Sequence, residues 1–366
     1  MTKKIIFSNY DSLKNPFYAG GGSVTNHYVA KNLAKKYEVV FYTGRYLGSK
    51  NEVVDNVSYV RIGSSLFGPK LGQLIFQGLL PFYVMTKKFD VWMESFTPPF
   101  STAFLPLFTK KPVIGVTHSL SGEEMSNRYK IPFYLIERLG LKTYKYIIVL
   151  SLCLKDKIQS INPKAQIEII PNGLEEKIIN QLVQNQPEHI LFIGRISMEE
   201  KGLDLLLKAY SCATGLSTPL IIAGSGLESE EIKLVNMIND YGLKDKVKWV
   251  GRVIGENKIE LMRKSLFLVV PSRNESFANV ALEAFSFNLP IICFDIPGLC
   301  WIPNKYAIKV KSFDEKALSK SMIDLVNKNE LRVEMGRGAK VFVRNFSWDT
   351  TVNQYLFFLD KILMKK

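Results

Sequence analysis

The sequence predicts an α/β protein of two doubly wound parallel-sheet domains with a cleft between them. Short apolar runs rich in β-branched residues alternate with helical patterns along most of the chain, which is typical of parallel sheets covered by helices. The chain has 366 residues, which is too long for one ordinary hydrophobic core. Several of the apolar runs end in polar or glycine-rich loops, where such sheets bind ligands.

Composition places the chain among soluble globular proteins. Hydrophobic residues make up 47% and charged residues 22% of the sequence. It contains no uncharged apolar run long enough to span a membrane. The start, Met1–Lys4 followed by a short apolar strand, does not have the form of a signal peptide. We therefore expect a cytoplasmic protein.

The charge is uneven. The formal net charge is +14, and residues 1–170 account for +11 of it, with 22 Lys and Arg against 11 Asp and Glu. A basic first half attracts an anionic partner, such as a phospholipid surface, a lipid-diphosphate acceptor or nucleic acid. The alternative, a general surplus of lysine for solubility, leaves the asymmetry unexplained.

The first strand leads into a glycine-rich loop. Ile5–Phe7 reads as the strand, Gly20–Gly22 as the end of the loop, and Val24–Lys36 as the helix that follows. Glycines allow a backbone to approach a ligand closely, although a plain flexible loop has the same composition. The glycine spacing is not that of the dinucleotide fingerprint.

The stretch Leu66–Val84 is apolar and poor in charge, and Lys70, Lys87 and Lys88 flank it. It predicts either a membrane-interfacial element with basic neighbours or a core helix of the first domain broken near Pro81. We favour the core helix, and both interpretations can hold in part.

A histidine follows a later strand of the first half. The apolar run Val113–Thr117 ends at His118, just past the carboxyl end where α/β sheets place ligands. A single histidine is more often structural. The chain has only two others, His27 in the first predicted helix and His189 at the start of a later strand.

The second half opens on another strand, loop and helix, now with two cations. The strand His189–Ile193 is followed by Gly194, Arg195 and Lys201. An arginine fork and a lysine point charge suit a diphosphate. The alternative is that Arg195 and Lys201 lie on the surface and neutralise the neighbouring Glu199 and Glu200.

The stretch Pro271–Glu283 is the centre of the prediction. The buried-strand pattern Leu266–Val270 precedes it, and a helical pattern begins after Ser276. A helix start after a strand offers free N–H groups and a positive dipole end to a phosphate. Glu275 and Glu283 would then bind hydroxyl groups on either side of the phosphate. The alternative is a capped surface helix with two solvated glutamates.

These residues carry a resemblance to a known family. Glu275-(seven residues)-Glu283, within Pro-Ser-x-x-Glu-Ser-Phe and Leu-Glu-Ala, resembles the signature of retaining glycosyltransferases of family four. Gly194-Arg195-(five residues)-Lys201-Gly resembles the family's diphosphate-binding segment. Ala278 departs from the family, which often has glycine there, and so does the segment 299–306, where a glycine-rich version is expected.

The resemblance implies the GT-B fold, in which two Rossmann-like domains face a central cleft. The first domain would bind the acceptor; it would cover residues 1–171 and be joined by a C-terminal helix at 350–366. The second domain would bind the nucleotide sugar and cover residues 172–349. Glu275, His118, Arg195 and Lys201 would be catalytic. The donor would bind at Gly21, Gly22, Gly194, Arg195, Lys201, Gly224, Val253, Glu275, Ser276, Phe277, Ala278, Asn279 and Glu283.

The implied activity is transfer of a hexose-type sugar with retention of configuration. The donor would be a UDP- or GDP-linked sugar, and the acceptor a hydroxyl of a glycan or lipid-linked molecule in surface polysaccharide synthesis. No Asp-x-Asp metal motif is present, so no metal or cofactor is expected. The cytoplasmic protein would be peripheral on the inner face of the cell membrane if its basic half binds anionic lipid.

Three alternatives remain open from the sequence. An epimerase or hydrolase of the same fold would turn over the sugar nucleotide without an acceptor. A non-catalytic protein would bind nucleotide or membrane and give no product. A nucleic-acid binder would explain the basic charge, but no nucleic-acid module or basic–aromatic stripe is recognised, so nucleic acid is not an expected partner.

Overall fold

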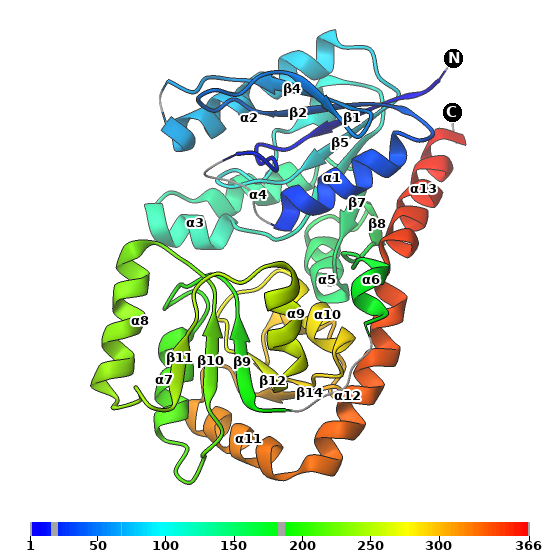
Figure 1. Cartoon of the computed structure of the whole chain (residues 1–366). Coiled ribbons are helices and arrows are strands. Elements are labelled where there is room, and N and C mark those ends of the chain that lie inside the picture. The colour runs from blue at the N-terminus through cyan, green and yellow to red at the C-terminus, as the bar shows by residue number, and fades with distance from the viewer. Residues whose placement is uncertain (1, 16–20, 67, 182–186, 365–366) are drawn as a thin grey trace. The chain divides into compact units, whose positions relative to one another are not determined.

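The computed structural model describes residues 2–15, 21–66, 68–181 and 187–364 (Figure 1). The chain divides into two compact units. Unit 1 comprises Met1–Gly173 and Trp348–Lys366, and unit 2 comprises Leu174–Ser347. The sequence placed the corresponding borders at 171/172 and 349/350.

Unit 1 is built on an eight-stranded sheet in the order β3-β4-β2-β1-β5-β6-β7-β8. All neighbours pair in parallel except β3 and β4. Strands β2 to β4 lie on one side of β1, and strands β5 to β8 lie on its other side. A topological switch point therefore lies between β1 and β5. The strands are β1 Lys4–Ser8, β2 Glu38–Gly44, β3 Glu52–Val54, β4 Val57–Ile62, β5 Val91–Ser95, β6 Val113–Thr117, β7 Tyr146–Val149 and β8 Gln166–Ile169.

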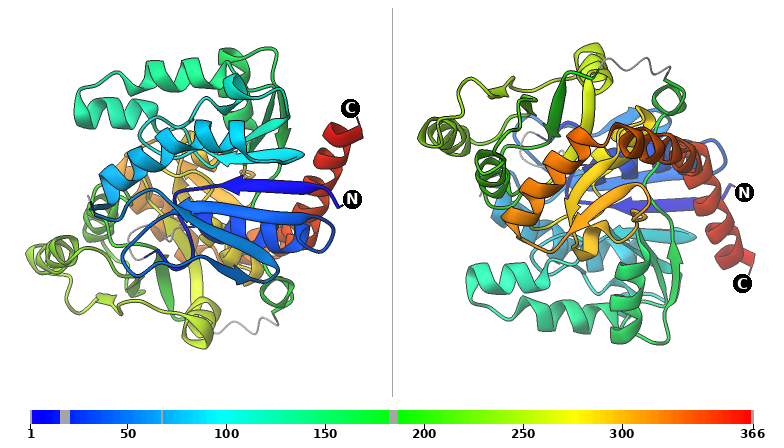
Figure 2. Two further views of the ribbon diagram at one scale, coloured as in Figure 1. Left: turned by 90° about the horizontal axis from the view of Figure 1, so that it is seen from above. Right: turned by 90° about the horizontal axis from the view of Figure 1, so that it is seen from below.

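Two hydrophobic layers cover this sheet, because side chains alternate between its faces. Ile5 and Phe7 pack with helices α1 and α13, whereas Ile6 packs with α2 and α5 (Figure 2). The C-terminal helix α13 thus completes the core of unit 1. The helices of unit 1 are α1 Gly21–Leu33, α2 Gly68–Thr86, η1 Leu105–Phe108, α3 Gly122–Tyr129, α4 Phe133–Leu141, α5 Leu152–Ile161 and α13 Trp348–Met364.

Unit 2 has a six-stranded, fully parallel sheet in the order β11-β10-β9-β12-β13-β14. Its switch point lies between β9 and β12, and every residue of β12 is buried. The strands are β9 His189–Ile193, β10 Leu220–Ala223, β11 Val247–Trp249, β12 Ser265–Val270, β13 Ile291–Phe294 and β14 Ala307–Val310.

Helices connect these strands and cover the sheet. Parallel strands require such crossover connections. The helices of unit 2 are α6 Glu176–Ile179, α7 Leu203–Ser211, α8 Glu228–Asp240, α9 Gly255–Arg263, α10 Asn279–Ser286, η2 Pro297–Leu299, α11 Glu315–Asn327, α12 Asn329–Val343 and η3 Arg344–Phe346. The expected fold class, two Rossmann-like parallel-sheet domains, is therefore confirmed.

The stretch predicted as either a core helix or an interfacial element forms α2, and Pro81 lies inside the helix without ending it. Phe76, Leu80 and Val84 are buried in the core of unit 1. The opposite stripe carries exposed apolar side chains, at Leu71, Leu74, Phe82 and Met85. No helix in the described part of the chain is both long and apolar enough to cross a membrane.

Two helical glycines give opposite expectations for substitution by alanine. A Cβ at Gly336 in α12 would lie 2.0 Å from the carbonyl oxygen of Asn288, whereas a Cβ at Gly78 in α2 meets nothing within 4 Å. We predict that Gly336→Ala lowers the free energy of unfolding by about 1–3 kcal/mol through overpacking. Gly78→Ala should raise it by about 0.5–1 kcal/mol, because alanine loses less backbone entropy. Denaturant unfolding measures both, and stabilisation by Gly336→Ala would contradict the close packing of α12.

Candidate functional site

Two loops of unit 2 leave the sheet at its switch point. One follows β9 and contains residues 194–202, and the other follows β12 and contains residues 271–278. Because β9 and β12 are parallel neighbours, both loops lie at the carboxyl edge of the sheet. Open α/β sheets bind ligands at this position, since the two loops leave in different directions there.

An ion pair joins the two loops. The Nζ of Lys201 lies 2.6 Å from Oε1 of Glu275, and the side chains are only 19% and 12% exposed. The Ser272 hydroxyl donates to the same carboxylate oxygen at 2.8 Å. Since both charges are largely shielded from water, this pair is held more firmly than a surface salt bridge. Two residues that the sequence assigned separately are thus in direct contact.

Glycines permit the close approach of these backbones. Gly202 has a φ of +65°, and a Cβ there would lie 1.9 Å from the carbonyl oxygen of Pro271. At Gly298, a Cβ would lie 1.7 Å from the carbonyl oxygen of Glu275. Any side chain at either position would displace the loop that carries Lys201 or Glu275.

Arg273 is a residue that the sequence analysis did not single out. Its guanidinium forms two hydrogen bonds to the Asp204 carboxylate, of 2.7 and 2.6 Å, and a third to the Glu199 carbonyl at 2.8 Å. Its backbone N–H donates to the Glu200 carbonyl at 3.1 Å. Arg273 therefore fastens the β12 loop to the β9 loop and to the start of α7. The only signal in the sequence is its place between Pro271 and Glu275.

Arg195 is oriented differently from Lys201. Its guanidinium contacts both carboxylate oxygens of Glu200, at 2.5 and 2.6 Å, and its side chain is 61% exposed. The alternative raised from the sequence, a surface pair with a neighbouring acid, therefore describes Arg195 in this structure. A role for Arg195 at a diphosphate would require its release from Glu200, which costs little for an exposed pair.

A helix begins where the sequence predicts an anion-binding helix start. Helix α10 begins at Asn279, and the preceding Ala278 adopts left-handed backbone geometry with a φ of 50°. Glycine adopts this geometry without strain, which gives a physical reason for the glycine expected there. Phe277 is buried and stacks on Trp301 with ring centroids 4.4 Å apart, so its side chain belongs to the core. Its neighbour Ser276 is partly exposed in the loop.

Glu283 lies in α10 and pairs with Lys258 of α9 at 2.6 Å. Both side chains are about a quarter to a third exposed, so a ligand hydroxyl can reach them. The ion partner of Glu283 is thus Lys258, whereas that of Glu275 is Lys201. The two predicted glutamates therefore form two separate ion pairs.

The other residues that are predicted to bind the donor, Gly194, Gly224 and Val253, lie in the loops after β9, β10 and β11. Gly224 has a φ of +145°, and a Cβ there would lie 1.7 Å from the Gly194 carbonyl oxygen. The Gly224 N–H donates to the Gly251 carbonyl at 2.7 Å. The backbones of Gly224 and Gly194 therefore lie so close that Gly224 has no room for a side chain. Val253 is partly exposed in the loop that leads to α9.

In unit 1, the structure brings His118 close to Gly22, which lies in the first turn of α1 and not in a loop. His118 follows β6, and a Cβ at Gly22 would lie 3.3 Å from its Cδ2. Its Nε2 is buried and has no hydrogen-bond partner among the described residues. Gly21 begins α1 and accepts a hydrogen bond from Thr25, while the loop residue Gly20 lies outside the described residues.

The other two histidines have partners inside the fold. His27 contacts the Tyr59 hydroxyl at 2.6 Å and the Asp55 carboxylate at 3.0 Å. His189 contacts the Leu261 carbonyl at 3.2 Å and the Ser265 hydroxyl at 3.0 Å. Both therefore have structural roles, and His118 is the histidine with a free, shielded nitrogen. Within the described ranges, no three His, Cys, Asp or Glu side chains gather as they would around a metal ion.

Two family models match the chain. Residues 19–177 match the model described as "Glycosyltransferase Family 4", and residues 175–342 match the model described as "Glycosyl transferases group 1". The two matches follow each other along the chain and correspond to the two sheet-containing units. With the fold, they support a glycosyltransferase of the family-four type.

Curated relatives match a part of the chain. An uncharacterized glycosyltransferase of Methanocaldococcus jannaschii is 28% identical over 56% of this chain and 56% of its own length. A D-inositol 3-phosphate glycosyltransferase of Gordonia bronchialis is 29% identical over 55% of this chain and 46% of its own length. The match thus spans about half the length of these relatives.

Solved structures resemble the whole fold. Sucrose-phosphate synthase from Thermosynechococcus elongatus superposes with a TM-score of 0.81 at 18% identity, over 100% of both chains. The Anabaena protein HepE, solved in complex with UDP and glucose, gives a TM-score of 0.76 at 15% identity, over 98% of this chain and 100% of its own. At such low identities the likeness shows the fold alone. Because it extends over the whole chain, the fold is GT-B.

The environment of His118 predicts a pH dependence. Burial lowers the pKa of His118 from 6.5 to about 4. The unfolded chain therefore takes up this proton at a higher pH than the folded protein does. Neutral His118 contributes stability above about pH 6.5, and this contribution is lost as the pH falls toward 4. NMR titration of the ring Cε1–H signals should give His118 a midpoint near 4.

A matched variant separates this effect from general acid unfolding. His118→Gln carries no titrating ring, so it should lose less stability than the wild type between pH 6.5 and 4. A His118 midpoint close to 6.5 in the folded protein would show that the ring is solvated and would contradict the prediction.

Proposed function

We propose that this chain is a retaining glycosyltransferase that moves a hexose-type sugar from a UDP- or GDP-linked donor to a hydroxyl of a glycan or lipid-linked acceptor. The observation that carries the proposal is the shielded Lys201–Glu275 pair at the switch point of unit 2. It places a cation for a diphosphate next to a carboxylate for sugar hydroxyls. The two family-model matches support the same class of reaction.

In this proposal, the diphosphate of the donor lies between the two loops. The N–H groups of residues 277–279 and the positive end of α10 would bind its oxygens. Lys201 would neutralise charge that develops on the leaving diphosphate, and Arg195 would join it after leaving Glu200. The chain's own cations would then do the work that a metal ion does in other transferases.

The two glutamates would hold the donor on either side of the diphosphate. Glu275, kept in place by Ser272 and Lys201, would accept hydrogen bonds from hydroxyls of the sugar. Glu283 would accept them from the ribose and exchange its contact with Lys258 for this purpose. In the family mechanism, the acceptor attacks from the side of the leaving group, and the leaving phosphate takes the acceptor proton. His118 of unit 1 is proposed to contact the donor sugar.

Removal of either member of the ion pair should abolish most of the transfer. We predict that Glu275→Ala and Lys201→Ala each lower kcat on the order of 100-fold or more, because a transition-state charge partner is lost. Product formation from labelled sugar nucleotide and acceptor measures this. Leu227→Ala, which removes an exposed side chain of unit 2, is the control. Folded variants with near-normal rates would remove both roles.

The acceptor side of the proposal involves a membrane surface. The exposed side chains of α2, Leu71, Leu74, Phe82 and Met85, recur at helical spacing on one face. Phe82 and Met85 are 58% and 57% exposed, and Lys87 and Lys88 follow directly after the helix. An apolar stripe beside lysines suits the surface of an anionic bilayer. A surface glycan on a lipid carrier would be presented there.

Vesicle sedimentation tests this membrane role. The protein should pellet with vesicles that contain anionic lipid and remain in solution with purely neutral ones. Phe82→Ser combined with Met85→Ser should weaken binding by about tenfold or more, because two apolar side chains no longer insert. Val341→Ser, at a 63% exposed position of unit 2, is the matched control. Binding that ignores both the lipid charge and the α2 substitutions would contradict this role.

A further inference from the structure

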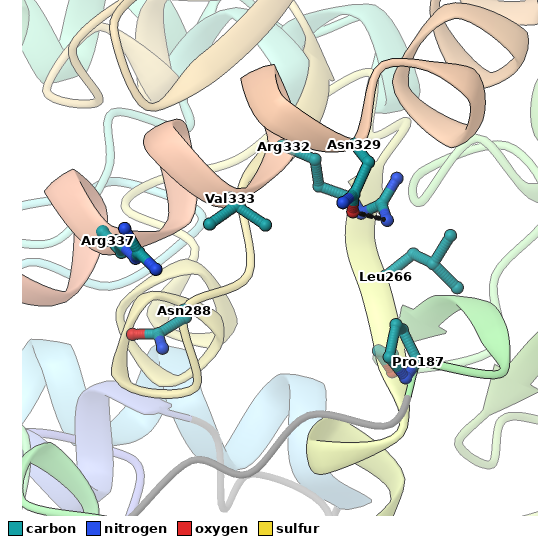
Figure 3. A pocket seen from close by; sticks show the side chains of 8 residues that line it. Pro187, Leu266, Asn288, Asn329, Arg332, Val333 and Arg337 are labelled. Atoms are coloured by element: carbon teal, nitrogen blue, oxygen red, sulfur yellow. Dashed lines mark hydrogen bonds between the residues drawn. The ribbon is translucent and has the colours of Figure 1, made fainter.

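A pocket lies in unit 2 beside the amino end of the central strand β12 (Figure 3). Its volume is about 250 Å³. Side chains of α12 form one side of it, and the start of β12 and the turn before β13 form the other. We call it the arginine pocket, and its lining residues are Pro187, Ser265, Leu266, Asn288, Asn329, Arg332, Val333 and Arg337.

The arginine pocket is separate from the proposed donor site. Strand β12 has six residues, with Ser265 at one end and Val270 at the other. At about 3.3 Å per residue, the strand puts roughly 16 Å between the arginine pocket and the loop that carries Glu275. A ligand in this pocket would therefore lie at the opposite edge of the sheet from a bound donor.

Arg332 is held in the arginine pocket by neutral groups. Its Nη1 donates to the carbonyls of Leu325 and Val326 at 2.8 and 3.0 Å, and its Nη2 donates to Oδ1 of Asn329 at 2.6 Å. These bonds cap the end of α11 and fix the direction of the guanidinium. They supply no negative charge, and burial lowers the pKa of Arg332. An anion would compensate this partly buried charge.

Arg337 is the second cation. No ion pair or hydrogen bond of its guanidinium is recorded among the residues that the structure describes. Figure 3 shows Arg337 beside Asn288, whose backbone is fixed by left-handed geometry with a φ of 57°. The close approach of Gly336 to the Asn288 carbonyl holds this turn against α12.

Among the described residues that line the arginine pocket, none carries a carboxylate. Glu330 and Glu334 of α12 line a neighbouring, more open depression, which shares Asn329, Val333 and Arg337 with the arginine pocket. Both glutamates are exposed, so water screens their charge. Leu266, Val333 and Pro187 add an apolar floor between the polar ends of the pocket. The pocket thus combines two cations, two amides and a small apolar surface.

We propose that the arginine pocket is a second ligand site, which binds a small phosphate monoester. Guanidinium forks match the geometry of phosphate oxygens, and the pocket volume lies near the lower end of the range for small-molecule sites. The phosphate lies against Arg337, and Arg332 adds positive charge at the other end of the pocket. The neutral part of the ligand contacts Asn288 and the apolar floor.

Calorimetric titration of the full chain with glucose 6-phosphate tests the proposal, and inorganic phosphate serves as the probe for the anion alone. Arg337→Ala should weaken binding of both by about tenfold or more, the usual effect of losing a charge-assisted hydrogen bond. Arg344→Ala removes another exposed arginine just beyond α12 and should leave binding unchanged. Equal affinity of Arg337→Ala and wild type would overturn the proposal.

Two further variants make the result specific to this pocket. Val333→Phe fills the pocket without changing the charge and should also weaken binding of glucose 6-phosphate, while thermal unfolding confirms that the variant is folded. Lys201→Ala should retain this binding, because it alters only the opposite edge of the sheet. Loss of binding in Lys201→Ala but not in Arg337→Ala would place the phosphate in the β9 and β12 loops and overturn the proposal. Nucleoside-diphosphate binding by Arg337→Ala tests the proposed function independently.

Discussion

The pairing of Lys201 with Glu275 is the interaction on which the account of unit 2 depends. The two residues are 74 positions apart in the sequence and meet because β9 and β12 are parallel neighbours. Neither charge is fully solvated, so each compensates the other. Gly202, Gly298 and Arg273 all serve this arrangement, since they allow or fasten the contact between the two loops.

In the proposed function, Lys201 and Glu275 would exchange each other for parts of the donor when it binds. A diphosphate offers Lys201 a stronger partner than Glu275, and sugar hydroxyls offer Glu275 hydrogen bonds in return. The exchange would replace one set of charge-assisted contacts by another without leaving a charge unpaired. Arg195 and Glu283 have similar partners in Glu200 and Lys258, so the same exchange applies to each.

Much of the fold and the composition of the candidate site were predictable from the sequence. The apolar runs at His189–Ile193 and Leu266–Val270 are strands because parallel, fully covered strands are continuously hydrophobic. The geometry was not predictable: the ion partner of each site residue depends on strand order, which no local pattern encodes. Arg273 was missed for this reason, since its partners lie 69 or more positions away. The outer stripe of α2 was ambiguous because periodicity does not say which apolar face is covered.

The central claim is that Lys201 and Glu275 form part of a nucleoside-diphosphate site, and calorimetric titration with UDP, GDP and ADP tests it most directly. The account predicts that one of these ligands binds selectively to the wild type. It also predicts that Lys201→Ala weakens this binding by about tenfold or more while the protein stays folded. Absence of binding for all three, or equal affinity of the wild type and Lys201→Ala, would contradict the account.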